Sequence, residues 1–267
     1  MEAPLFILLC LLLGLTSGFL GGLLGIGGGV VIVPLLSLYF DATGRFSSDS
    51  SVLIAVATSL SCIVFTSASA AYTQFRAGKI VWPIASKLVV FLLIGSLLAG
   101  YVAPELPASV FRLFIGIFLA SVAVVMLLRW QPAPHRQLPG MVGCGGIGMG
   151  GGLLAGMAGI AGGNVIVPTL VYFNVPIHNA TATSSALGVP IAFMGAVGYF
   201  WLSPPLAQPG LFGYIDVSAF VPIVIGALIA APIGVKTAHR VAAPKLKRIF
   251  GVLLIFASAR MIVTAII

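Results

Sequence analysis

Charged residues are scarce in this 267-residue sequence, since only 7% of its residues are Asp, Glu, Lys or Arg. A soluble domain carries about 25% charged residues. The shortage excludes a soluble fold, as do the 60% share of hydrophobic residues and the mean hydropathy of +1.20. Apolar runs long enough for a membrane-spanning helix recur along the chain, and the alternating pattern of a membrane barrel is absent. The sequence therefore predicts an all-α integral membrane protein.

Acidic residues are the scarcer charged class, with five against 13 basic residues and a net charge of +8. None of the five lies in the middle of a predicted span, and Asp216 comes nearest, at a helix end. Carriers of metal cations usually hold carboxylates inside the membrane, so the composition favours an anionic substrate. The excess of basic residues is interpreted as loop charge that sets membrane orientation. We expect no nucleic-acid partner.

Residues typical of catalytic and metal sites are also missing. Cys10, Cys62 and Cys144 form no CxxC pair and no metal-ligand spacing, so free buried thiols are expected. The GxGxxG run at 143–148 follows no predicted strand and is not interpreted as a dinucleotide site. The sequence has no Ser-His-Asp set and no HExxH motif. It therefore predicts no enzyme activity, no cofactor and no metal site.

What the chain does contain is an internal repeat. The segment GFLGGLLGIGGGVVIVPLL at 18–36 aligns with GLLAGMAGIAGGNVIVPTL at 152–170, with more than half of the positions identical. Further on, the Ala-Thr-Ser at 57–59 matches the same triplet at 182–184. Each half thus has the same order of elements, namely a glycine-broken segment, a Thr-Ser helix and two further helices.

The repeat divides one membrane domain into a first half at 1–129, a linker at 130–139 and a second half at 140–267. Each short segment of about ten residues cannot cross a bilayer alone. We therefore expect it to form a broken hairpin or re-entrant pair with the preceding helix. Three crossings then remain in each half, and this odd number predicts an inverted repeat. The predicted helices cover 4–24, 30–40, 50–74, 80–101, 108–129, 140–160, 164–174, 180–202, 213–235 and 246–267.

The distribution of basic residues agrees with that topology. Most lie in or near the loops of one side, which the positive-inside rule makes the cytoplasmic side. The predicted orientation places both termini on the outer, periplasmic side of a bacterial inner membrane. The cytoplasmic set comprises Arg76, Lys79, Lys87, Arg129, Arg136, Lys236, Arg240, Lys245, Lys247 and Arg248, while Arg45, Arg112 and Arg260 belong to the other side.

The glycine-rich breaks are the strongest functional signal. Irregular backbone at membrane depth implies a cavity or protein surroundings, and a helix that restarts there presents free N–H groups and a positive dipole end. Two such ends near the midplane would form an anion site. The alternative is that glycines only allow close helix packing, as in the GxxxG pairs at 18–22 and 152–156. The predicted break or hinge positions are Gly25, Pro34, Gly159 and Pro168, and the predicted substrate-binding glycines are Gly27, Gly28, Gly29, Gly162 and Gly163.

Small hydroxyl and amide side chains complete the predicted substrate site. Thr58 and Ser59 in the first half match Thr183 and Ser184 in the second. Their hydroxyls can donate to an anion, although hydroxyls in membrane helices also bond to the preceding turn. Asn164 has Val30 as its counterpart, and its amide can either cap the helix or contact the substrate.

The doubled GxxGGxxGIGGGxxxVPxL pattern, followed each time by a Thr-Ser helix, resembles the sulfite exporter TauE/SafE family. The resemblance covers nearly the whole chain, although Ala161 and Asn164 stand where the first copy has Gly27 and Val30. It implies transport of small anions across the bacterial inner membrane, such as sulfite, organosulfonates or small organic acids.

We therefore expect a secondary transporter that moves a small anion, in the export direction, between two inverted halves. No nucleotide-binding sequence is present, so an ion gradient or the membrane potential must supply the energy. The coupling ion, a proton or sodium, stays open, and so does a homo-oligomeric state. Two other functions stay open as well: a channel for anions or small solutes, and a membrane subunit that carries nothing itself.

Overall fold

The computed structural model describes residues 2–127, 139–201, 210–238 and 244–266, and these residues form a bundle of helices. Seven of the helices are long and apolar enough to cross a membrane, and α2 and α7 are shorter apolar helices. The first half holds α1 (Glu2–Leu24), α2 (Gly29–Thr43), α3 (Ser48–Arg76), α4 (Trp82–Glu105) and α5 (Ala108–Leu127). The second holds α6 (Met141–Ala158), α7 (Gly163–Tyr172), α8 (Ile177–Trp201), α9 (Val217–Ala238) and α10 (Pro244–Ile266).

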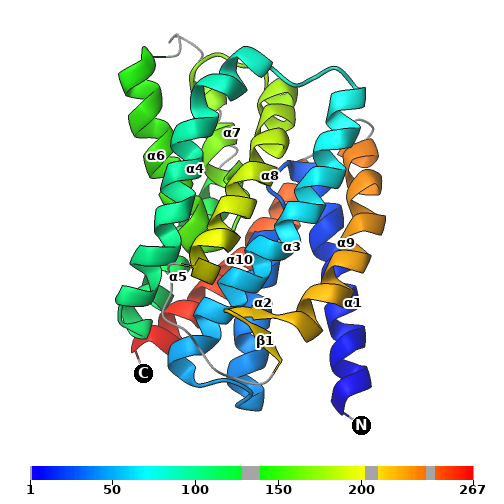
Figure 1. The fold of residues 1–267 in the computed structure, drawn as a ribbon. Coiled ribbons are helices and arrows are strands. Elements are labelled where there is room, and N and C mark those ends of the chain that lie inside the picture. The colour runs from blue at the N-terminus through cyan, green and yellow to red at the C-terminus, as the bar shows by residue number, and fades with distance from the viewer. Residues whose placement is uncertain (1, 128–138, 202–209, 239–243, 267) are drawn as a thin grey trace.

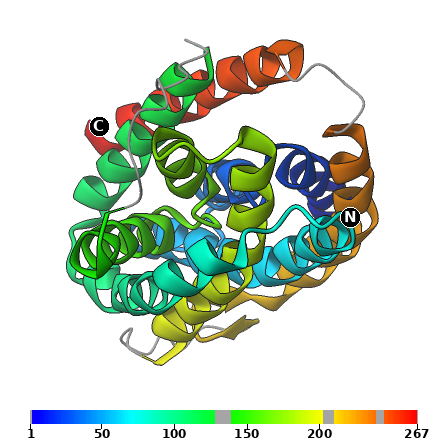
Figure 2. The same ribbon diagram turned by 90° about the horizontal axis from the view of Figure 1, so that it is seen from above.

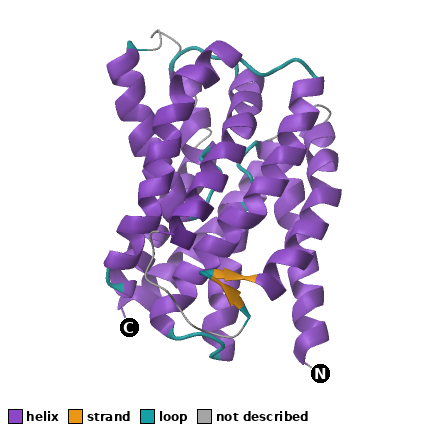
Figure 3. Cartoon of the chain, viewed as in Figure 1, coloured by secondary structure: helices purple, strands orange, loops and turns teal. Residues whose placement is uncertain are grey.

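Two hairpins with opposite directions organise the bundle. Helices α1 and α2 form a hairpin whose outer ends lie at the end of the molecule that carries both termini (Figure 1). Helices α6 and α7 form the other hairpin, whose outer ends lie at the opposite end. Figure 3 shows the loop segments between the members of each hairpin about half-way along the bundle, among helices on all sides.

The two halves interlock instead of packing as separate bodies. Helix α1 packs mainly on α9, and α6 packs mainly on α4, so each broken helix lies on the other half. The Thr-Ser helices α3 and α8 contact each other in the interior, and 83% of the apolar span of α3 is buried. Helices α5 and α10 pair along one flank (Figure 2). The centre is thus built by α2, α3, α7 and α8.

Close glycine contacts hold the α1–α9 and α4–α6 pairs. A Cβ on Gly18 would lie 2.6 Å from the Cα of Ala227 in α9, and one on Gly156 would lie 2.6 Å from the Cβ of Ala99 in α4. Small residues at such positions let helix backbones approach and pack without polar groups. The packing interpretation of the GxxxG pairs therefore holds for the helices that precede the breaks.

The predicted helix bounds agree with the structure within a few residues; the largest differences, of four residues, are at the end of α4, predicted at 101 and observed at Glu105, and at the start of α9. The prediction placed that start at 213, whereas α9 begins at Val217. The reason is a small antiparallel ribbon of β1 (Leu211–Phe212) and β2 (Ile215–Asp216), in which Gly213 makes the turn with φ 61°. Most of the predicted linker at 130–139 lies outside the described residues.

Candidate functional site

Both helix breaks are made by glycines in the left-handed region of backbone conformation. Gly25 (φ 69°) follows α1 and Gly28 (φ 81°) precedes α2. In the second break Gly159 (φ 68°) and Gly162 (φ 74°) occupy the matching positions. Side chains other than hydrogen rarely adopt these angles, so glycine is needed there. Gly27 is also left-handed, whereas its counterpart Ala161 is not, which explains why the second copy tolerates alanine.

The two breaks contact each other reciprocally at the centre of the bundle. A Cβ added to Gly29 would collide with the carbonyl oxygen of Gly159, and a Cβ added to Gly163 would collide with the carbonyl oxygen of Gly25. Between these contacts, Gly27 lies against the Cβ of Ala161. The backbones of the two breaks are therefore in direct contact. We call this place, where the break at 25–29 contacts the break at 159–163, the crossing of the two breaks.

The first turns of α2 and α7 present unpaired backbone donors at the crossing. In the described residues, the amides of Gly29, Val30, Gly163 and Asn164 donate to no acceptor, as expected for the first residues of a helix. The positive ends of both helix dipoles thus face the interior of the protein. This is the arrangement that stabilises an anion.

Proline does not interrupt the two short helices. Helix α2 continues through Pro34 and α7 continues through Pro168, so the breaks lie upstream, at the glycines. A proline at the sixth residue of a helix lacks the amide that would bond to the carbonyl four residues earlier. In α2 and α7 those carbonyls belong to Val30 and Asn164, in the first turn.

Ser59 of α3 and its repeat counterpart Ser184 of α8 differ in their hydrogen bonds. The Ser59 hydroxyl donates to the carbonyl oxygen of Gly159 at 2.8 Å and so ties α3 to the second break. The Ser184 hydroxyl is fully buried and has no hydrogen-bond partner. A buried hydroxyl without a partner costs free energy unless a ligand or water satisfies it. Ser184 is therefore the better candidate for substrate contact.

The hydroxyls of the matched threonines, Thr58 and Thr183, each accept a backbone hydrogen bond at the start of a neighbouring helix. The Thr58 hydroxyl accepts a hydrogen bond from the backbone N–H of Asp216, just before α9, at 2.9 Å. The Thr183 hydroxyl accepts one from the backbone N–H of Val81, just before α4, at 3.0 Å. Both bonds join the two halves. Each threonine still has its own hydroxyl hydrogen, so substrate contact by Thr58 or Thr183 stays a prediction.

Asn164 lies in the first turn of α7 with its amide nitrogen buried and unpartnered. Its side chain makes no hydrogen bond to any described residue, so the capping role that the sequence left open is not seen there. Sequence reasoning missed two other buried hydroxyls without a partner, those of Ser67 in α3 and Tyr199 in α8. Ser67 lies near Gly27 and Gly188, at 3.1 and 2.9 Å from their ideal Cβ positions.

The family of the chain follows from comparison with known proteins. A family model described as "Sulfite exporter TauE/SafE" matches residues 10–261. The chain belongs to this family. Both breaks and both Thr-Ser helices lie inside the matched range. The TauE/SafE assignment, with the seven apolar helices, makes the protein a multi-pass membrane transporter and not an enzyme.

Curated relatives of this TauE/SafE protein are also named as transporters. A "Probable membrane transporter protein" of Haemophilus influenzae is 30% identical over 263 residues, which cover 96% of this chain and 98% of that protein. One of Methanocaldococcus jannaschii is 26% identical, covering 93% and 92% of the two chains. One of Bacillus subtilis is 26% identical, covering 87% and 89%. No solved structure matches the chain significantly.

Two Arg–Asp pairs of this TauE/SafE protein lie at the end of the bundle that carries the termini. Arg112 donates to both oxygens of Asp41, at 2.6 and 2.9 Å. Arg45 donates to Asp216 at 3.2 Å. Sequence reasoning treated Asp216 as a helix-end residue, but the structure buries it completely. Pairing across 171 residues of sequence carries no local signal, so the partner of Asp216 could not be predicted.

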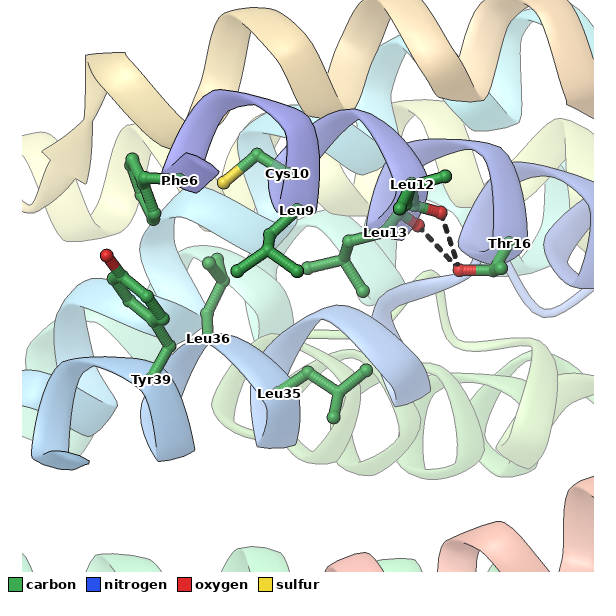
Figure 4. Close-up of a pocket in the computed structure, with 9 residues that line it drawn as sticks. All are labelled: Phe6, Leu9, Cys10, Leu12, Leu13, Thr16, Leu35, Leu36 and Tyr39. Atoms are coloured by element: carbon green, nitrogen blue, oxygen red, sulfur yellow. Dashed lines mark hydrogen bonds between the residues drawn. The ribbon is translucent and has the colours of Figure 1, made fainter. Parts of the chain in front are cut away.

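An apolar hollow of about 320 Å³ lies between α1 and α2. Figure 4 shows Phe6 and Tyr39 at one end of it and Thr16 at the other, where the Thr16 hydroxyl donates to the carbonyls of Leu12 and Leu13. The rest of its lining is aliphatic except for Cys10. With only the hydroxyls of Thr16 and Tyr39 and the thiol of Cys10 in its lining, this hollow has fewer donors for an anion than the crossing of the two breaks.

Proposed function

We propose that this transporter carries a small oxyanion, such as sulfite, an organosulfonate or a small organic acid, through the crossing of the two breaks, in the export direction. The observation that carries the proposal is the set of buried donors without partners at that crossing. These are the first amides of α2 and α7 and Asn164 Nδ2 in the first turn of α7. To them we add Ser184 Oγ in α8, because the next residue, Ser185, lies beside Gly25 of the first break. All are neutral, so they can bind an anion without a permanent buried charge.

An inverted repeat supports a transport cycle in this proposal. Each contact between helices of the two halves has a counterpart. The contact of α1 with α9 corresponds to that of α6 with α4, and the contact of α3 with α9 corresponds to that of α8 with α4. Gly95 of α4 lies against α6, and its sequence counterpart Gly226 of α9 lies against α1. In the cycle that we propose, a pseudo-two-fold axis in the membrane plane relates two groups of helices, each drawn from both halves, and their relative movement exposes the site alternately.

The proposed direction follows from the membrane potential. The potential contributes about 2.3 kcal/mol per charge per 100 mV, which drives an anion out of a negative interior. Export of an anion therefore needs little else. The orientation that we propose for the bacterial inner membrane has both termini on the outer side, because most basic loop residues then face the cytoplasm.

Efflux from proteoliposomes tests this function. Vesicles that contain the purified protein are loaded with labelled sulfite, and an inside-negative potential is imposed with a potassium gradient and valinomycin. We expect efflux to depend on the protein and to accelerate with the potential. Efflux equal to that of protein-free vesicles would contradict the proposal, and single-channel conductance steps in a planar bilayer would replace it with the channel function.

A further inference from the structure

Several hydroxyl side chains of α3 bond back to their own helix. Ser61, Thr66 and Thr73 each donate to the carbonyl oxygen four residues earlier, at 2.9, 3.1 and 3.0 Å. This is a common arrangement for serine and threonine in membrane helices. Ser67 departs from it, because it is only 1% exposed and its hydroxyl has no hydrogen-bond partner among the described residues. Its hydroxyl is therefore available to a group that the chain itself does not supply.

Ser67 lies at the crossing of the two breaks. Its Oγ atom is 3.1 Å from the ideal Cβ position of Gly27 in the first break and 2.9 Å from that of Gly188 in α8. A Cβ on Gly27 would collide with the Cβ of Ala161 in the second break, and one on Gly188 would lie 3.0 Å from the same atom. The Ser67 hydroxyl is thus placed where α3, α8 and both breaks meet.

This hydroxyl belongs to one half of the repeat only. By the alignment of the two Thr-Ser helices, the counterpart of Ser67 is Ala192, and the counterpart of Gly188 is Ile63. The Ile63 side chain packs on the first break, with its Cγ2 atom 3.1 Å from the ideal Cβ position of Gly27. The second half therefore has no side chain in the place that Ile63 fills in the first, and the Ser67 hydroxyl faces that place.

The start of α2 follows directly from the contact between Gly27 and Ser67. The amides of Gly29 and Val30, two and three residues after Gly27, donate to no acceptor in the described residues. A serine hydroxyl can rotate its hydrogen toward whichever acceptor is present. A buried side-chain donor thus lies beside the positive end of the α2 dipole, where an anion is stabilised.

From this arrangement we propose that Ser67 is a substrate-binding residue of the transporter, whose hydroxyl donates to an oxygen of the carried oxyanion beside the start of α2. Gly27 and Gly188 leave the space around that hydroxyl. The two breaks are in direct contact in this structure, so the anion reaches Ser67 when they separate during the transport cycle. This inference rests on the proposed function, because it names a further residue that binds the same anion.

Sulfite efflux from proteoliposomes, measured over a series of internal sulfite concentrations, tests the role of Ser67. We expect Ser67→Ala to raise the KM about tenfold or more, the size expected for the loss of one hydrogen bond to a charged partner. The maximal rate should change less than the KM. The melting temperature without sulfite should not fall, because the variant loses no hydrogen bond within the protein.

Ser61→Ala is the matched control, since it makes the same chemical change in the same helix. The Ser61 hydroxyl is engaged with the carbonyl oxygen of Ala57, so it has no free hydrogen for the substrate. We expect the KM of Ser61→Ala to equal that of the wild type. A rise in KM as large as that of Ser67→Ala would overturn the inference, because the effect would then not be specific to the unpartnered hydroxyl.

Ser67→Cys separates donation to the substrate from the filling of space. The thiol occupies the same place as the hydroxyl but is only a weak donor. If Ser67 binds the anion, the KM of Ser67→Cys lies close to that of Ser67→Ala. A KM equal to the wild-type value would mean that the side chain only fills space, and would overturn the inference.

The remaining outcomes distinguish this inference from the proposed function. Normal sulfite transport by the wild type with an unchanged KM for Ser67→Ala would overturn the inference and leave the proposed function intact. A lower melting temperature of Ser67→Ala with an unchanged KM would assign the hydroxyl to the fold and overturn it as well. Wild-type protein that carries no sulfite would overturn both.

Discussion

The double variant Asn164→Val, Ser184→Ala should lose sulfite transport by about a hundredfold or more while it folds at least as stably as the wild type. Each side chain presents a buried polar atom without a partner in the protein, so removing it abolishes no internal hydrogen bond. Valine is also the residue at the matching position of the first repeat, Val30. The lost bonds to an anion contribute about 1.5–3 kcal/mol each. Initial efflux rates and thermal melting in detergent measure the two effects.

Ser59→Ala provides the matched control, because Ser59 is the repeat counterpart of Ser184 and its hydroxyl is engaged with Gly159. We expect Ser59→Ala to lower the free energy of unfolding by about 1–3 kcal/mol, since a buried carbonyl loses its donor. Equal melting curves for Ser59→Ala and Ser184→Ala would contradict the assignment of one serine to the fold and the other to the substrate. So would full transport by the double variant.

Gly29→Ala should prevent the two breaks from packing and abolish transport. The added methyl group would collide with the Gly159 carbonyl and lie about 3.0 Å from the Ser59 hydroxyl. Backbone atoms cannot move aside as a flexible side chain can, so we expect a cost at the upper end of the roughly 1–3 kcal/mol typical of overpacking. Melting temperature, monodispersity in detergent and efflux rate report the effect.

Gly163→Ala should have the same effect, because Gly163 meets the Gly25 carbonyl in the reciprocal contact. Gly146→Ala in α6 is the control, since nothing lies within 4 Å of its ideal Cβ. That change should be neutral or stabilise the helix by up to about 1 kcal/mol. If Gly29→Ala is tolerated as well as Gly146→Ala, the crossing is not the close backbone contact described above.

Much of the fold could be predicted because hydropathy and the internal repeat are local or periodic signals. The pattern at 18–36 and 152–170 located both breaks, and each break lies in a helical hairpin, as Figure 1 shows. The inverted repeat stays a prediction. The start of α9 was wrong by four residues, because a two-residue ribbon around Gly213 is too short to give a strand signal.

The details of the site could not be predicted, because they depend on contacts between distant segments. Ser59 and Ser184 have the same sequence context, yet only Ser59 meets a carbonyl of the opposite break. Likewise, nothing near Asp216 in the sequence indicates that it is buried against Arg45. The sequence identified the residue types at the crossing, and the packing of the two halves decides which of them stay unpaired.

Thermal unfolding with sulfite tests the central claim, that a small oxyanion binds at the crossing of the two breaks. The wild type and the Asn164→Val, Ser184→Ala variant are melted in detergent over a series of sulfite concentrations, with chloride at matched ionic strength as the reference. A ligand at 100 times its Kd stabilises the folded state by about 2.7 kcal/mol. The account predicts a sulfite-dependent rise in melting temperature for the wild type and none for the variant. An equal rise in both proteins would contradict it.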